Sequence, residues 1–241
     1  MMFFIFSKIE AKLAEQGISL KDALDFKNIK HSDNYFFLIA TFLLVFVNWG
    51  LESLKWKTLI NTILPKFSFF KSLKGILMGV SLGFVTPNRI GEFGGRLFNV
   101  PDGYKIKGVT LGFRGGMAQF IVTFSFGLVS ALFVYKDEMF SNNYVYVLLF
   151  IVLVILTIAY YRFTDFIKLV SKVKFLKRFI NFDYVDLFIS NSKLTKIFFI
   201  TMLRYLVYIN QYILLCYFFS IGVDYPLLFS IVSTMILTQT I

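Results

Sequence analysis

The sequence contains very little of what most catalytic and metal-binding sites require. Its 241 residues include one cysteine, Cys216, and one histidine, His31. A single cysteine excludes an internal disulfide, and one cysteine with one histidine makes too few ligands for a typical zinc site. P-loop, zinc-protease and Asp-x-Asp motifs are also missing from the sequence. We therefore expect no metal and no cofactor, and we assign no catalytic residue.

Acidic residues are scarce as well, because 14 Asp and Glu stand against 25 Lys and Arg and leave a net charge of +11. This positive charge is confined to the segments between long apolar runs, which argues against nucleic-acid binding and favours loops beside anionic lipid. The chain is 57% hydrophobic and 20% aromatic, with a mean hydropathy of +0.72. A soluble domain of this size could not bury so much apolar surface, so we predict an all-α, polytopic membrane helix bundle.

The apolar runs predict the individual membrane spans. Spans are expected at about 35–54, 109–135, 144–161 and 197–221, and another begins at 227. The basic segments 55–74 and 162–196 should face the cytoplasm. We divide the chain into an amphipathic N-terminal segment, residues 1–34, and a transmembrane domain, residues 35–241. Because the last span is unfinished, we expect this domain to be truncated at its C-terminus, and truncation at the N-terminus stays open.

The stretch from Lys71 to Arg96 is the most informative part of the chain. Gly75, Gly79 and Gly83 share one face of an apolar helix, a pattern that allows another helix to approach closely in a membrane. If this helix crossed the membrane, the basic residues after it would lie outside. A broken, re-entrant helix removes that conflict, provided that its irregular backbone is buried or lines a wet cavity. Both arrangements remain open from the sequence.

A break at Thr86-Pro87 also has a chemical consequence. We expect Thr86 to cap a new helix that begins at Pro87 and includes Gly91, with free N–H groups and the positive end of a dipole at its start. Arg89, Glu92 and Arg96 would then share one helical face. Glu92 can pair with either arginine, and the other guanidinium could bind a phosphate through two hydrogen bonds. The alternative is a salt-bridge cluster that only stabilises the broken helix.

Further polar residues occur inside the first predicted span. Asn48 and Glu52 share a helical face with Lys55 or Trp56. Trp49 and Trp56 are expected at headgroup level, with Lys55 and Lys57 extending toward the same interface. Glu52 does not fit this interfacial interpretation, because a carboxylate in a span is costly unless it is paired or hydrated.

Two arginines occur in the later spans. Arg114 either reaches the same site as Arg89 or extends to the cytoplasmic interface, and the sequence favours neither. Arg204 and Gln211 lie on one face of the span 197–221. An arginine at that depth requires an acidic partner or a wet cavity, and Glu52 and Glu92 are the candidates.

These residues resemble the motifs of a known membrane family. The run Thr86-Pro87-Asn88-Arg89-Ile90-Gly91-Glu92, followed by Arg96, resembles the P-x-R-x-G-E motif of the lysylphosphatidylglycerol synthase transmembrane (flippase-like) family. Asn48, Glu52 and Trp56 resemble its upstream N-x-x-x-E-x-x-x-W pattern, and Arg204-Tyr205 with Gln211 resembles a later element. The resemblance implies an all-helical membrane domain that in some relatives is fused to an aminoacyltransferase and is proposed to move phospholipids between leaflets. This chain has no room for the transferase, so lipid aminoacylation is not carried over.

We therefore predict an integral membrane protein that binds an anionic phospholipid headgroup and assists its translocation between leaflets. The predicted phosphate-binding residues are Arg89, Arg96, Arg114 and Arg204, and their polar partners are Asn48, Glu52, Glu92 and Gln211; Thr86, Pro87 and Gly91 form the structural break. The expected location is a bacterial cell membrane, with a partner enzyme or a second copy of the chain as further partners. Two alternatives are a membrane-embedded accessory or transferase in lipid or polyprenyl-linked glycan metabolism, and a non-transporting scaffold.

Overall fold

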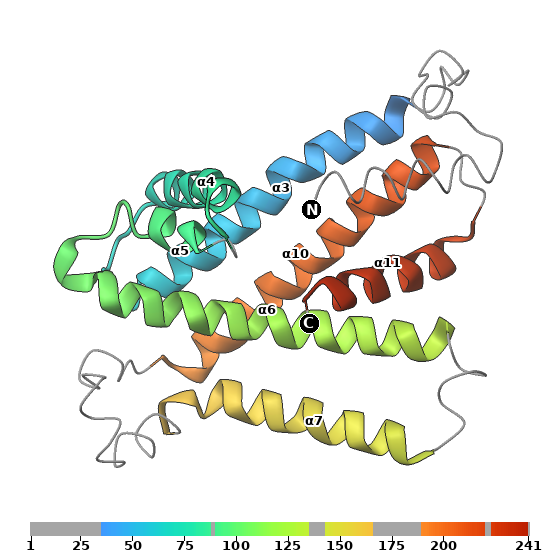
Figure 1. Cartoon of the computed structure of the whole chain (residues 1–241). Helices are drawn as coiled ribbons and strands as arrows, with labels where there is room; N and C mark the ends of the chain where they lie inside the picture. The colour runs from blue at the N-terminus through green and yellow to red at the C-terminus, as the bar shows by residue number, and fades with distance from the viewer. Residues whose placement is uncertain (1–34, 88–89, 135–142, 166–188, 220–222, 241) are drawn as a thin grey trace.

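The computed structural model describes residues 35–87, 90–134, 143–165, 189–219 and 223–240, and within these ranges it contains helices and no strand (Figure 1). The predicted N-terminal amphipathic segment, Arg89, the loop after the second span and most of the basic segment 162–196 lie outside the described residues. The predicted all-helical membrane architecture is confirmed for the rest.

The long helices coincide with the predicted spans. They are α3 (Tyr35–Ile60), α6 (Lys105–Val134), α7 (Asn143–Tyr161), α10 (Asn191–Phe218) and α11 (Tyr225–Thr240). Within the described residues, α3 and α10 are long and apolar enough to cross a membrane, and Val147–Tyr161 and Tyr225–Gln239 are shorter apolar helices. The main difference is at the end of α3, which continues six residues beyond the predicted limit near residue 54.

The helices pack around α10, which contacts α3, α6 and α11, while α6 also contacts α7 and α11. Figure 1 shows α3 and α10 running side by side in opposite directions. One group of buried side chains, including Trp56, Leu111 and Ile197, joins α3, α6 and α10. A second group, including Ile209 and Val232, joins α10 to α11. Both groups include side chains of α10.

Large apolar side chains also cover the outside of the bundle. Examples are Phe36, Phe42 and Phe46 on α3, and Phe150 and Ile155 on α7, which are 55–71% exposed. Contiguous apolar surface of this kind is rare on soluble monomers, and it suits contact with lipid tails. The long apolar helices and their exposed apolar faces therefore agree with a membrane-embedded bundle.

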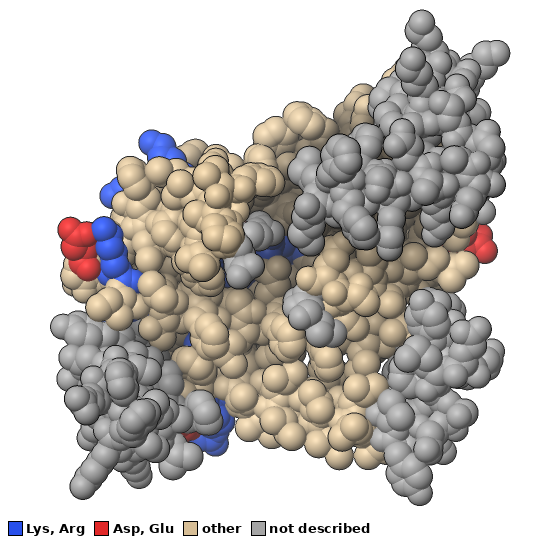
Figure 2. Space-filling view, viewed as in Figure 1, with Lys and Arg blue, Asp and Glu red and all other residues tan. Residues whose placement is uncertain are grey.

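Among the residues that the structure describes, positive charge gathers at one end of the bundle. The end of α3, the start of α6, the end of α7 and the start of α10 lie together at the left of Figure 1. Lys57, Lys105, Lys107, Arg162 and Lys193 occupy these helix ends, and Figure 2 shows basic side chains over the same part of the molecule, with mainly uncharged surface elsewhere. By the positive-inside rule, we expect this end to face the cytoplasm.

The glycine-rich stretch forms a folded-back hairpin of α4 (Phe69–Val85) and the short α5 (Gly91–Arg96). The Asn99 side chain donates a hydrogen bond to the Lys71 carbonyl over 3.1 Å, so the chain returns to the level at which it entered. Figure 1 shows α4 nearly end-on, whereas α6 and α7 lie across the view. The predicted break is confirmed, and the chain enters and leaves the hairpin on the same side, as a re-entrant segment requires.

The glycine face of α4 makes this hairpin possible. A Cβ added to Gly79 would lie 2.8 Å from the Glu92 carbonyl oxygen, and one added to Gly95 would lie 2.3 Å from the Gly79 backbone nitrogen. A Cβ added to Gly75 would lie 3.0 Å from the Arg96 carbonyl oxygen. The glycine face of α4 therefore packs against α5 of the same hairpin.

The α-helix after the break begins at Gly91, later than predicted, whereas Pro87 lies in a 3-10 turn and residues 88–89 lie outside the described residues. Thr86 is the C-cap of α4, and α5 begins at Gly91. The Thr86 hydroxyl accepts a hydrogen bond from the Gly91 N–H over 2.8 Å and donates one to the Leu82 carbonyl over 2.9 Å. Thr86 thus ties the two helices together across the turn. Since α5 has only six residues and its first turn already carries Glu92, the predicted anion site at a helix N-terminus is not supported.

Candidate functional site

The candidate site begins with a buried polar face on α3. Asn48, Glu52 and Lys55 occupy successive turns on one side of this helix and are only 8%, 3% and 1% exposed. The predicted interfacial positions of Lys55 and Trp56 are therefore wrong, since Trp56 is also only 1% exposed. The reason is the longer α3, whose last turns lie inside the bundle and against the apolar interior.

Glu52 is the centre of the site because three cations surround its carboxylate. Its Oε2 lies 2.8 Å from Lys55 Nζ and 3.1 Å from Arg204 NH1, and its Oε1 lies 2.8 Å from Arg96 NH1. These cations come from α3, α10 and α5. The predicted need of Glu52 for a partner is thus met by residues from three helices, including the predicted partner Arg204.

Arg96 links Glu52 to the folded-back hairpin. On α5, the Arg96 guanidinium also forms an ion pair with Glu92 one turn earlier, in the favourable order of acid before base. The side chains of Arg96 and Glu92 are 15% and 24% exposed. Because Gly79 and Gly95 set the distance between α4 and α5, these glycines also set the position of Arg96 in the site.

Amide groups complete the surroundings of Arg204. Its Nε donates to Asn48 Oδ1 over 2.9 Å and its NH1 donates to Gln119 Oε1 over 2.7 Å. Gln119 Oε1 also accepts a longer hydrogen bond from Lys55 Nζ, at 3.4 Å. The sequence interpretation missed both Gln119 and Lys55 as site residues. Lys55 had a signal, because it lies one helical turn from Glu52, whereas nothing in the sequence connected Gln119 to this face.

We call Glu52, Lys55, Glu92, Arg96 and Arg204 the charged cluster. These five side chains carry three positive and two negative charges, an excess of one positive charge. A cavity of about 100 Å³ adjoins the cluster and is lined by Lys55, Glu92, Phe93, Arg96, Gly112, Gly116 and Gln119. This volume is well above the roughly 10–15 Å³ that one water needs. The cavity therefore has room for more than one water molecule beside the charged cluster.

Arg114 lies elsewhere, in contrast to both interpretations of it. It is 3% exposed, so it does not extend to the interface. Its guanidinium donates to the Tyr160 carbonyl over 3.0 Å and to the Thr164 hydroxyl over 3.2 Å, and it lies 5.1 Å from the Phe163 ring centre. Arg114 thus joins α6 to the C-terminal end of α7, where a cation also suits the helix dipole. We no longer count it among the phosphate-binding candidates.

The other predicted site residues lie outside the charged cluster or outside the residues that the structure describes. Gln211 is 8% exposed on α10, and its Nε2 has no hydrogen-bond partner within the described part of the chain; the structure places it outside the charged cluster. Thr86 and Gly91 form the turn between α4 and α5. Arg89 lies outside the described residues, so its predicted role stays a prediction. Among the described residues, no group of three His, Cys, Asp or Glu side chains could hold a metal ion.

Comparison with known proteins gives one match. Residues 19–241 match the family described as the lysylphosphatidylglycerol synthase TM region. No curated protein and no solved structure matches the chain. The family match covers nearly the whole chain, and it is the family whose motifs the sequence resembles. The chain therefore belongs to the lysylphosphatidylglycerol synthase transmembrane family, and it is a membrane protein of lipid metabolism.

Proposed function

We propose that this protein binds the phosphate of an anionic phospholipid headgroup at the charged cluster and assists the movement of that lipid between leaflets. The observation that carries the proposal is a cavity beside a cluster with surplus positive charge, on a segment that folds back within the bundle. An anion in this cavity would balance the surplus charge and lie within reach of Arg96 and Lys55. Arg89 belongs to the proposal on the sequence motif alone.

The cluster also provides a reason for the lipid to leave again. Glu52 is already paired with three cations and Glu92 with Arg96, so a bound phosphate competes with carboxylates for the same guanidinium. Strong but shared ion pairs favour exchange of partners over permanent binding. A translocation pathway requires such moderate binding, because a headgroup held too firmly would not move on.

The two carboxylates of the charged cluster fit a transferase less well. General base catalysis requires a carboxylate that is free to accept a proton from the reacting group. Glu52 lies between three cations, and Glu92 is paired with Arg96. Both are therefore better suited to hold cations in position than to activate a nucleophile.

Leaflet exchange in reconstituted vesicles tests the proposal. Fluorescent phosphatidylglycerol is incorporated into proteoliposomes, and the fraction protected from a membrane-impermeant reductant measures exchange. We expect exchange to be lost in Arg96→Gln, which removes the cation, and to be slowed in Arg89→Lys, because lysine keeps the charge but cannot form the bidentate contact of arginine. Arg162→Gln is the matched control, since Arg162 is 77% exposed and paired only with Asp165 in the described contacts.

Two results would contradict the proposal. Exchange that is unchanged in Arg96→Gln would show that the charged cluster does not take part. Chemical modification of the lipid headgroup in place of exchange would favour the transferase, and absence of both activities from a correctly folded protein would favour the scaffold.

A further inference from the structure

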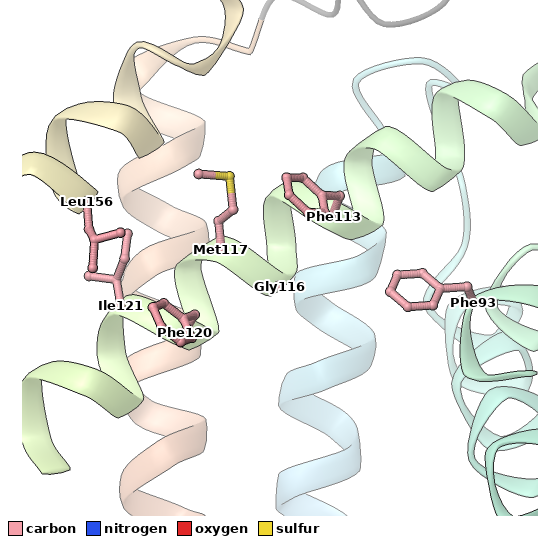
Figure 3. A pocket seen from close by; sticks show the side chains of 7 residues that line it. All are labelled: Phe93, Phe113, Gly116, Met117, Phe120, Ile121 and Leu156. Carbon is pink, nitrogen blue, oxygen red and sulfur yellow. The ribbon is translucent and has the colours of Figure 1, made fainter. Parts of the chain in front are cut away.

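A second cavity lies beside the charged cluster and has the opposite character. Its volume is about 310 Å³, and all seven residues that line it are apolar or glycine: Phe93, Phe113, Gly116, Met117, Phe120, Ile121 and Leu156. Figure 3 shows that they come from α5, α6 and α7, with the Phe93 ring directed toward the α6 side. This volume is at the lower end of the range for small-molecule pockets.

The apolar cavity adjoins the cavity of the charged cluster. Phe93 and Gly116 line both of them. Phe93 also follows Glu92 directly in α5, so neighbouring residues of one short helix face a charged space and an apolar space. A ligand that fills both must carry an ionic group next to a hydrocarbon part.

We propose that the apolar cavity holds one acyl chain of the anionic phospholipid whose phosphate lies at the charged cluster. This inference rests on the proposed function and specifies how the lipid is oriented. Phe93 and Gly116 mark the boundary between headgroup and chain, and the chain lies between α6 and α7.

The cavity contributes position more than affinity. A chain that leaves the bilayer for this cavity exchanges one apolar surrounding for another, so the hydrophobic effect adds little. What the cavity supplies is a fixed path for the chain while the headgroup contacts Arg96. Blocking the cavity should therefore change the position of the bound lipid strongly and the affinity for the lipid only modestly.

Gly116 offers a way to block the cavity without disturbing the helices. A Cβ added to Gly116 would meet no atom within 4 Å, and the same holds for Gly50 on α3. Gly116→Leu should fill the junction of the two cavities, whereas Gly50→Leu adds the same side chain at a position that lines neither of them. The two variants form a matched pair.

Photocrosslinking in nanodiscs tests this inference. The probes are phosphatidylglycerol and phosphatidylcholine, each with a photoreactive diazirine on one acyl chain. We expect the phosphatidylglycerol probe to label Met117 or Leu156 in competition with unlabelled phosphatidylglycerol. This labelling should fall at least severalfold in Gly116→Leu and remain unchanged in Gly50→Leu. Equal labelling by the phosphatidylcholine probe, or labelling only of the exposed face of α3 around Phe42 and Phe46, would show ordinary boundary lipid and overturn the inference.

A second measurement separates failure of this inference from failure of the proposed function. Dihexanoyl phosphatidylglycerol is soluble in water and carries the headgroup with very short chains. If it binds to the protein in an Arg96-dependent manner while the long-chain probe does not label the cavity, the acyl site is wrong and headgroup binding stands. If neither lipid shows specific binding, both proposals fail.

Discussion

The close contact between Gly79 and Gly95 should make the hairpin very sensitive to a single added methyl group. A Cβ on Gly95 would lie 2.3 Å from the Gly79 nitrogen and 2.4 Å from its Cα. Because these are backbone atoms, they cannot rotate away, and α5 must separate from α4. Overpacking of this kind costs typically 1–3 kcal/mol, so we expect about 3 kcal/mol for Gly95→Ala. For a chain of this length, that predicts a fall in Tm of about 6–12 °C.

Cys216 provides the assay, since it is the one cysteine of the chain and lies partly buried on α10. A thiol-reactive dye reports its exposure as the detergent-solubilised protein is heated. Gly94→Ala is the matched control, because a Cβ on Gly94 meets no atom within 4 Å. Removing a helical glycine there should leave Tm unchanged or raise it slightly. Equal Tm values for Gly95→Ala and Gly94→Ala would refute the close packing of the hairpin.

Three further predictions concern the buried charged residues. Glu52→Gln leaves three buried or half-buried cations without their shared carboxylate. Thermal unfolding should therefore show that the free energy of unfolding falls by about 3–5 kcal/mol. The control Asp102→Asn, at a carboxylate that is 92% exposed, should cause no measurable change in Tm. Arg114→Gln should lower Tm because α7 loses its contact with α6, yet the folded protein should bind phosphatidylglycerol with unchanged affinity; weakened binding would return Arg114 to the lipid site. Arg96→Lys should exchange lipid more slowly than the native protein and faster than Arg96→Gln, since it keeps the charge but loses the planar fork; full activity would exclude bidentate recognition at this position.

The sequence predicted the helices well because their signals are local. Long apolar runs define the spans 35–54 and 144–161, and a proline after a threonine marks the break at residue 86. The sequence also predicted that Glu52 and Arg204 pair, because an unpaired carboxylate or guanidinium is costly inside a membrane. These inferences depend on the properties of single residues and not on which helices pack together.

The remaining features depend on tertiary packing, which one sequence does not reveal. Lys55 and Trp56 look like interfacial residues until α3 is seen to continue to Ile60 and bury its last turns. Arg114 was predicted either to reach the lipid site or to extend to the interface, but the Tyr160 carbonyl and the Thr164 hydroxyl accept its hydrogen bonds. Gln119 has no unusual sequence signal at all. Its role follows only from the approach of α3 and α10 to α6.

Binding of a soluble headgroup tests the central claim most directly. Gly112 lines the cavity beside the charged cluster, and Trp56 lies next to it, because a Cβ on Gly112 would be 3.8 Å from the Trp56 ring. In a Trp49→Phe background, Trp56 is the only tryptophan left, and its fluorescence can be followed during titration with dihexanoyl phosphatidylglycerol. We predict a saturable change that phosphatidylcholine of the same chain length does not produce and that Arg96→Gln abolishes. An identical response to both lipids, or one that persists in Arg96→Gln, would contradict headgroup binding at this cluster.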